Sequence, residues 1–285
     1  MEVNPMEKLL IVDGCNLLFQ MFFGMSSRIV NKDGKAIQGV LGFVGAFIKI
    51  IKMTSPTHLI ILFDGEHENS RTKLLADYKA NRIDYSTVPD ENNPFSQIKD
   101  IYHALDFLDV KYTEIAEHEA DDVISSYVLK YEKKMEIIIS SFDSDFFQLI
   151  NDSVSILRYR GDHTILCDPS YIWNKYGISP GQYADFKALT GDPSDNIKGA
   201  EKVGPKTAAA LINQFGSLHN VVTNAGEITK PSIRESILRN TERLHNNCKL
   251  IKLDDKAGIP FDISELIYNY NGITTNEVLA GINLK

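Results

Sequence analysis

The chain has 285 residues, of which 43% are hydrophobic, and a net charge of −8 at pH 7. This length allows one large α/β domain or two smaller ones, and the composition argues against a mainly disordered chain. The three cysteines have no paired spacing, so a disulfide framework and a zinc site are not expected. Without an apolar signal segment or a run long enough to span a bilayer, the sequence predicts a soluble cytoplasmic protein.

The first two-thirds of the chain alternate between strand patterns and helix patterns. Apolar runs typical of strands lie at residues 9–12, 58–63, 110–115, 136–140 and 154–159. Residues 39–53 and 94–108 have the periodicity of helices. This alternation predicts an α/β fold with a mostly parallel, twisted sheet that is covered by helices.

Later segments have a different character. Residues 85–94 are polar, contain two prolines and lack periodicity, which predicts a mobile loop. From about Ser170 onward the strand patterns fade and short helices dominate. We therefore divide the chain into an α/β core at residues 1–169 and a helical subdomain at residues 170–285.

Four of the predicted strands lead to acidic residues. These are Asp13, Asp64, the Glu119–Asp122 segment and Asp143. A single Asp-Gly after a strand is commonly only a turn. In parallel sheets, however, the carboxyl ends of the strands form the edge where ligands bind. Four acidic ends there would repel one another unless cations were bound, and carboxylate oxygens favour Mg²⁺, Mn²⁺ or Ca²⁺.

A first acidic set consists of Asp13, Asp64, Glu119, Asp121 and Asp122. Glu119 and Asp122 are three residues apart, so they would share one face of a helix near its N-terminus, where negative charge is favourable. A simple capping cluster with Asp121 as the N-cap explains this segment alone equally well.

A second set consists of Asp143, Asp145, Asp192 and Asp195. The DSD motif after a strand can direct two carboxylates at one cation, and the two aspartates of GDPSDN at residues 191–196 can face the same point. Each motif alone could be a turn with an N-cap. Together they indicate a second metal ion, and two ions about 3.5–4 Å apart support an in-line displacement at phosphorus.

Two further segments suit a nucleic acid. Residues 199–211 place a Gly-Pro-Lys-Thr turn before an Ala-rich helix, as in a helix-hairpin-helix that holds phosphate through backbone N–H groups. A simple helix start with Pro205 in its first turn is the alternative. Residues 71–82, as a helix, would present cations and an aromatic ring to a single strand. A solvated helix is the alternative for this segment.

The ordered motifs VDG at 12–14, FDG at 63–65, EADD at 119–122, DSD at 143–145 and GDPSDN at 191–196 resemble those of the 5′-nuclease (flap endonuclease) superfamily. The resemblance extends from about Leu9 to about Phe215. It is strongest to the 5′-3′ exonuclease domain of bacterial DNA polymerase I and its stand-alone bacterial homologues. It implies a PIN-like core, a helical arch at about 66–95 and a helix-hairpin-helix at about 190–220.

The resemblance also implies site residues and two ions of Mg²⁺ or Mn²⁺. The implied ligands are Asp13, Asp64, Glu119, Asp121 and Asp122 for one ion, and Asp143, Asp145, Asp192 and Asp195 for the other. The implied catalytic residues are Asp13, Asp64, Asp143 and Lys79, the last helping to activate the scissile phosphate. The implied DNA contacts are Arg71, Tyr78, Lys79, Arg82, Lys198, Lys202, Gly204, Lys206 and Thr207.

Two positions depart from the family pattern. Gln20 stands where the family usually has an arginine, which removes a cation near the active site. Lys202 stands where the hairpin often has a glycine, so it must adopt the turn without the freedom of glycine at φ > 0. The hairpin is therefore expected either to hold K⁺, as in the family, or to contact phosphate directly.

The implied function is a structure-specific 5′ nuclease that cleaves DNA with a 5′ flap or free 5′ end, in primer removal and repair. No membrane partner is expected, and a monomer is the simplest assembly. The alternatives are a PIN-like ribonuclease and a non-catalytic DNA-structure-binding protein. A haloacid-dehalogenase-type phosphatase is disfavoured because Cys15 stands where it needs a second aspartate. The chain is interpreted as a stand-alone enzyme, with a domain excised from a longer polymerase as the alternative.

Overall fold

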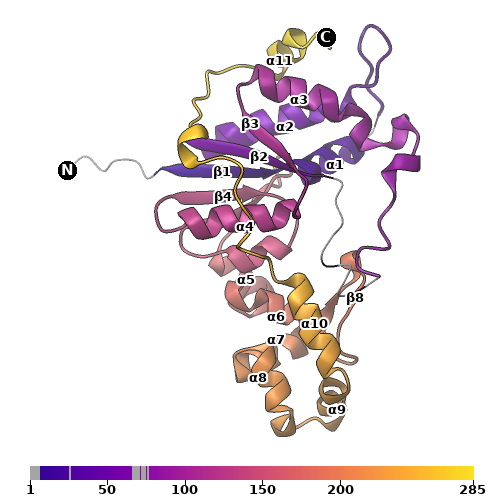
Figure 1. Cartoon of the computed structure of the whole chain (residues 1–285), viewed down its shortest axis with the longest axis vertical. Helices are drawn as coiled ribbons and strands as arrows, with labels where there is room; N and C mark the ends of the chain where they lie inside the picture. The colour runs from indigo at the N-terminus through magenta and orange to yellow at the C-terminus, as the bar shows by residue number, and fades with distance from the viewer. Residues whose placement is uncertain (1–6, 26, 66–70, 72–74, 76) are drawn as a thin grey trace, which may run out of the picture.

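The computed structural model describes residues 7–25, 27–65, 71, 75 and 77–285. Its central feature is a six-stranded sheet with the order β3-β2-β1-β4-β5-β6 (Figure 1). The strands are β1 (Lys8–Asp13), β2 (His58–Asp64), β3 (Lys111–Ile115), β4 (Glu136–Ser140), β5 (Val154–Arg158) and β6 (Ile165–Cys167). Strands β1 to β5 pair in parallel and β6 pairs antiparallel to β5, which confirms the predicted mostly parallel sheet.

Helices cover both faces of the sheet and form the second part of the molecule (Figure 1). In the described residues they are α1 (Gly14–Gly24), α2 (Gln38–Thr54), α3 (Ile98–Phe107), α4 (Ala120–Tyr131), α5 (Pro169–Tyr176), α6 (Tyr183–Thr190), α7 (Pro205–Phe215), α8 (Leu218–Thr223), α9 (Pro231–Arg239), α10 (Thr241–Ile251) and α11 (Thr275–Gly281). None of these helices is both long and apolar enough to cross a bilayer.

Both faces of the sheet are buried. Leu10 and Val12 of β1 point into a core that they share with α1, α2, α3 and α11. Leu9 and Ile11, on the opposite face, belong to a core that continues through α4 into helices α6 to α10. Because side chains of a strand alternate between faces, burial on both sides explains why these strands are apolar without interruption.

The second part of the chain is helical, as predicted, and contains a helix-hairpin-helix. Helices α6 and α7 flank a short hairpin of β7 (Gly191–Asp192) and β8 (Ile197–Lys198). Figure 1 shows α6 to α10 at the end of the molecule opposite α3 and α11. Asn247 of α10 donates hydrogen bonds to the carbonyls of Ala188 and Lys198, which fixes α10 against the base of the hairpin.

The end of the chain returns to the sheet. The amide of Leu59 in β2 donates to the carbonyl of Leu266, and the amide of Tyr268 donates to the carbonyl of Thr57. Helix α11 then packs on the side of α2 and α3 (Figure 1). The division of the chain at residues 169 and 170 stays a proposal, and the last residues lie against the first of its two parts.

The described part of the predicted arch is irregular. Residues 77–82 form turns, and the helix that we expected there is wrong for this part, because Lys79 has a left-handed backbone conformation with φ 55°. Three short 3₁₀ helices, Tyr85–Thr87, Asp90–Asn92 and Pro94–Gln97, follow it. The predicted mobility of residues 85–94 stays a prediction. Residues 66–70, 72–74 and 76 of the arch lie outside the described residues.

Candidate active site

Four aspartates line one pocket of about 580 Å³ at the carboxyl edge of the sheet. Asp13 and Asp64 are the last residues of β1 and β2, Asp121 lies in the first turn of α4, and Asp143 follows β4. We call Asp13, Asp64, Asp121 and Asp143 the central cluster. The sequence predicted that these strand ends meet, and the structure confirms it.

Among the described residues, the central cluster has no cation in direct contact with its carboxylates. Of the lysines and arginines that the structure describes, none has a nitrogen within 4.0 Å of these four carboxylates. Burial, followed by repulsion from Asp64 and Asp143, raises the pKa of Asp13 to about 7. Burial and the same kind of repulsion also raise the pKa of Asp121. Hard oxygen donors with uncompensated charge are the environment that a divalent cation fits.

Hydrogen bonds from backbone amides and from one hydroxyl group hold two of these carboxylates in place. Asp13 is the N-cap of α1 and accepts from the amide of Asn16 at 2.9 Å and from the Ser141 hydroxyl at 2.8 Å. Asp64 accepts from the amide of Ala120, the first residue of α4, at 2.7 Å. Asp13 can therefore cap a helix and line the pocket of the central cluster at the same time. The N-cap residue of α4 is Glu119, so the alternative with Asp121 as N-cap is wrong.

Glu119 and Asp122 lie on the same side of the start of α4, as predicted. Their carboxylates contact basic side chains. Arg71 contacts Glu119 and donates to Asp122 with an Nη2–Oδ1 distance of 2.7 Å. The Nζ atom of Lys79 lies 2.7 Å from Oε1 of Glu119. Neither acid is among the residues that line the pocket of the central cluster. Their role as metal ligands stays a prediction.

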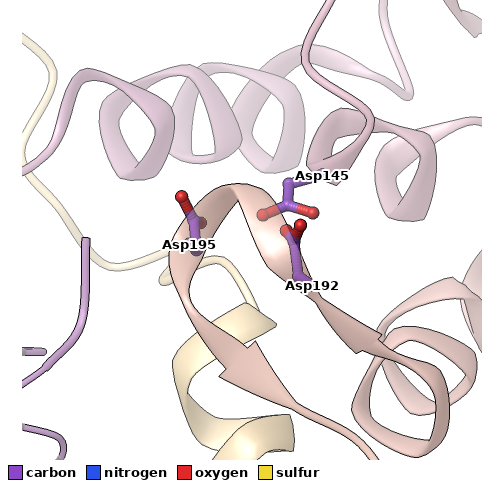
Figure 2. A group of neighbouring side chains, drawn as sticks. All are labelled: Asp145, Asp192 and Asp195. Carbon is purple, nitrogen blue, oxygen red and sulfur yellow. The ribbon is translucent and has the colours of Figure 1, made fainter. Parts of the chain in front are cut away.

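A second group of acids combines the β7–β8 hairpin with the segment that follows β4. Asp145, Asp192 and Asp195 each place a carboxylate oxygen within 4.8 Å of the others, and we call them the outer cluster. Figure 2 shows Asp192 and Asp195 on one turn and Asp145 on a separate segment, with the carboxylate of Asp192 next to that of Asp145. Asp143 lies in the central cluster but accepts a hydrogen bond from the amide of Asp145 at 2.8 Å, so it stands next to both clusters.

The outer cluster, unlike the central one, already contains cations. Lys187 of α6 contacts Asp145, and its Nζ atom lies 2.5 Å from Oδ2 of Asp192. Arg82 lies 3.0 Å from Oδ1 of Asp195. Burial alone would lower the pKa of Lys187, but the two aspartates raise it overall, so the ammonium stays charged. Our sequence analysis missed Lys187, although a lysine between the apolar residues Phe186 and Ala188 was a usable signal.

Glycine is required where the outer cluster meets α6. A Cβ atom on Gly199 would lie 2.3 Å from the carbonyl carbon of Thr190 and 2.4 Å from the carbonyl oxygen of Leu189. Gly191 has φ 81° at the same crossing. The backbones can approach closely only because these positions have no side chain, and this approach places Asp192 and Asp195 beside Asp145.

The predicted DNA contacts fall into two groups. Arg71 and Tyr78 are buried in this structure, with 7% and 6% of their surface exposed. Lys79 and Arg82 line the central pocket while also pairing with acids.

The hairpin residues are more accessible. Lys198, Lys202, Gly204 and Lys206 are exposed and Thr207 is half-buried. Lys202 has φ 65°, so it does adopt the left-handed turn that its position predicted. Gly204 is the N-cap of α7 and Pro205 its first residue. The simple helix start and the helix-hairpin-helix are thus both present.

Two other features were not predicted. Phe19, Ile83, Tyr85 and Phe95 form an apolar wall of the central pocket, with the Phe19 ring 5.1 Å from Tyr85 and 5.3 Å from Phe95 between centroids. Gln20 donates to the carbonyl of Tyr159 at 2.5 Å and does not line the pocket. The wall was missed because its aromatic residues come from separate segments.

Comparison with known proteins gives consistent family matches. Residues 8–177 match the family described as 5′-3′ exonuclease, N-terminal resolvase-like domain, and residues 178–273 match 5′-3′ exonuclease, C-terminal SAM fold. Thermostable DNA polymerase I of Thermus thermophilus is 32% identical over 263 residues, which are 92% of this chain and 30% of the polymerase. DNA polymerase I of Streptococcus pneumoniae is 31% identical over 269 residues, with the same shares of 92% and 30%. The chain thus spans about 30% of the length of these relatives.

Solved structures share the fold. A bacteriophage T5 flap endonuclease complex with DNA and metal ions has a TM-score of 0.72 at 22% identity, covering 97% of this chain and 100% of that chain. The catalytic core of Rad2 in complex with DNA has a TM-score of 0.57 at 16% identity, covering 97% and 93%. At these identities the likeness establishes the arrangement of the backbone.

Proposed function

The chain belongs to the 5′-3′ exonuclease family, and on that premise we propose that it is a structure-specific 5′ nuclease that hydrolyses DNA with two divalent metal ions. The substrate would be DNA with a 5′ flap or a free 5′ end. The protein would act as a monomer in primer removal and DNA repair.

The observation that carries this proposal is the central cluster. Four carboxylates line one pocket, and no described lysine or arginine has a side-chain nitrogen within 4.0 Å of their oxygens. This donor set fits one Mg²⁺ or Mn²⁺ ion, with Asp13, Asp64, Asp121 and Asp143 as its proposed ligands, and the outer cluster is the proposed site of the second ion. When bound, two ions would activate the attacking water and stabilise the leaving oxygen of the phosphodiester.

The side chains around the cluster have complementary tasks. Lys79 and Arg82 line the pocket beside the acids, so either can meet the negative charge that develops on the scissile phosphate. Lys79 would first have to exchange its contact with Glu119 for the phosphate. The apolar wall around Phe19 and Tyr85 offers the adjacent nucleotide a surface without charge. Cleavage would leave a 5′-phosphate and a 3′-hydroxyl.

The hairpin would bind the duplex next to the cleavage site. Lys198 and Lys202 are exposed there, as is Lys206 in the first turn of α7. Gly204, the N-cap residue of α7, is exposed as well. Backbone amides and ammonium groups at a helix start recognise phosphate without reading sequence. We favour direct phosphate contact at this hairpin over a K⁺ site because these three ammonium groups are accessible.

The test is cleavage of a 5′-labelled flap duplex with Mg²⁺ or with EDTA, beside a flap-free duplex and an RNA flap. We expect Mg²⁺-dependent release of a short product near the flap junction, with the DNA flap cleaved fastest. The Asp143→Asn variant should lose this activity while keeping its fold by circular dichroism. Faster cleavage of the RNA flap would favour a PIN-like ribonuclease. Tight binding without cleavage in Mg²⁺ or Mn²⁺ would favour a non-catalytic binder and overturn the proposal.

A further inference from the structure

The two acid clusters differ in how their charge is balanced. In the outer cluster, Lys187 contacts two of the three carboxylates, and Arg82 contacts the third. With every group ionised, the outer cluster thus keeps one uncompensated negative charge. The four carboxylates of the central cluster have no described cation within 4.0 Å. A divalent ion would therefore be attracted less strongly by the outer cluster than by the central cluster.

The cations of the outer cluster also differ from each other. The Arg82 side chain is 54% exposed, so it can leave Asp195 for solvent or for a phosphate at little cost. The Lys187 side chain is only 8% exposed and comes from α6, between the buried residues Phe186 and Ala188. Lys187 has no comparable route into water. Its ammonium therefore stays beside Asp145 and Asp192.

The position of Lys187 coincides with the space that a second ion would need. Its Nζ atom contacts carboxylate oxygens of both Asp145 and Asp192, which are two of the three acids that could hold an ion there. An ammonium and a divalent cation that share the same carboxylate oxygens compete, because the charges repel and the lone pairs are shared. Removing one partner of such a buried pair would leave uncompensated charge.

We propose that Lys187 is a resident cation of the outer cluster, which holds Asp145 and Asp192 in place without metal and weakens the binding of the second ion. The inference rests on the proposed two-ion function. If Lys187 has this role, the two ions bind in sequence: the central cluster is filled first, and the outer cluster is filled only at a higher metal concentration. Lys187 acts here as a positioning residue because it acts through the two aspartates.

Metal binding without DNA tests this directly. The binding of Mn²⁺ to the full chain would be followed by isothermal titration calorimetry and by electron paramagnetic resonance. In the wild type we expect one ion to bind at least tenfold more tightly than a second. Lys187→Met and Lys187→Gln, which remove the charge, should tighten the second ion at least tenfold. Lys187→Arg keeps the charge and should leave it weak, and Lys249→Met, at an exposed lysine of α10, is the matched control.

Thermal unfolding provides a second readout. In EDTA, Lys187→Met and Lys187→Gln should have a Tm several degrees below that of the wild type. Added Mg²⁺ should raise their Tm by more than it raises that of the wild type, because at a given concentration a ligand that binds the folded state more tightly stabilises it more, as the logarithm of 1 + [L]/Kd. A lower Tm that Mg²⁺ does not restore would mean that Lys187 is only structural, and would overturn the inference.

The outcomes separate the inference from the proposed function. A normal first ion, together with an unchanged or weaker second ion in both charge-removing variants, overturns the inference alone. Wild-type protein that binds no ion at all would overturn both. If Lys187→Met does not fold, the Lys187→Gln variant decides, since its amide can still donate to one aspartate.

Discussion

The carboxylate of Asp64 accepts a hydrogen bond of 2.7 Å from the backbone amide of Ala120. The end of β2 thereby fixes the start of α4, and the next residue of that helix is Asp121. One acid of the central cluster thus positions another. A substitution at Asp64 changes both the charge of the cluster and the helix that carries its neighbour.

Two substitutions separate these effects. Asp64→Asn keeps an oxygen that can accept from Ala120 and removes one negative charge, so its Tm in EDTA should equal or exceed that of the wild type. Asp64→Ala also loses the hydrogen bond to the first amide of α4, a contact like that of an N-cap side chain, and should be less stable than Asp64→Asn by about 0.5–2 kcal/mol. Both should lose nuclease activity. Equal stability of the two variants in chemical denaturation would show that the hydrogen bond to Ala120 contributes nothing.

The stability of the metal-free protein should fall as the pH rises. The pKa of Asp13 is raised from 3.8 to about 7, first by burial and then by Asp64 and Asp143. Between these values the folded state binds more protons than the unfolded state, so the free energy of unfolding decreases with rising pH. Calorimetry in EDTA from pH 4 to pH 8 would measure this decrease. Asp13→Asn should make it shallower, and Mg²⁺ should offset it; an equally steep decrease in Asp13→Asn would assign it to other groups.

Lys79 should contribute to catalysis more than to binding, because it lines the pocket of the central cluster. Lys79→Ala should lower the single-turnover rate roughly 10²–10³-fold, the usual cost of removing one group that stabilises developing charge. Its Kd for flap DNA should change far less. Loss of rate and of affinity by the same factor would mean that Lys79 only grips phosphate.

Lys206 should show the opposite behaviour, since it is exposed in the first turn of α7, outside the central pocket. Lys206→Ala should weaken binding to all flap sequences alike and reduce the slope of log K against log salt by about 1. At saturating DNA its single-turnover rate should match that of the wild type. An unchanged salt slope would exclude Lys206 from phosphate contact.

The turn at Lys202 permits a test of strain. Its φ of 65° lies in the left-handed region, which costs a residue with a Cβ atom roughly 1–2 kcal/mol relative to glycine. Part of that gain is lost in the unfolded state, so Lys202→Gly should be more stable than Lys202→Ala by about 1 kcal/mol. Both variants lose the same charge and should weaken DNA binding equally. A more stable alanine variant would contradict the left-handed turn.

Close backbone packing at Gly199 should be essential for the outer cluster. Gly199→Ala would place a methyl group 2.3 Å from the backbone of Thr190 and displace the turn that carries Asp192 and Asp195. We expect a loss of more than about 1 kcal/mol in the free energy of unfolding, together with weaker Mn²⁺ binding. Gly226→Ala, where a Cβ atom would meet nothing within 4 Å, is the matched control. Wild-type stability of Gly199→Ala would show that the backbone can move without cost.

The sequence by itself determined the sheet and the residues of the acid clusters. Uninterrupted apolar runs such as residues 58–63 predicted buried parallel strands, because burial on both faces removes the need for alternation. The positions of Asp13 and Asp64 at strand ends then followed, since parallel strands end at a common edge. The close pairing of Asp192 with Asp195 was likewise predictable, because a short turn fixes it locally.

Only the tertiary structure decided which charges neutralise one another. Arg71 meets Asp122 across 51 positions of sequence, and Lys187 meets Asp145 across 42. The distribution of Arg71, Lys79 and Lys187 among the acids therefore depends on how α4, α6 and the turns at 77–82 pack together. The periodicity of the sequence cannot predict such ion pairs, because a buried ion pair depends on which segments pack together and exclude water from both partners.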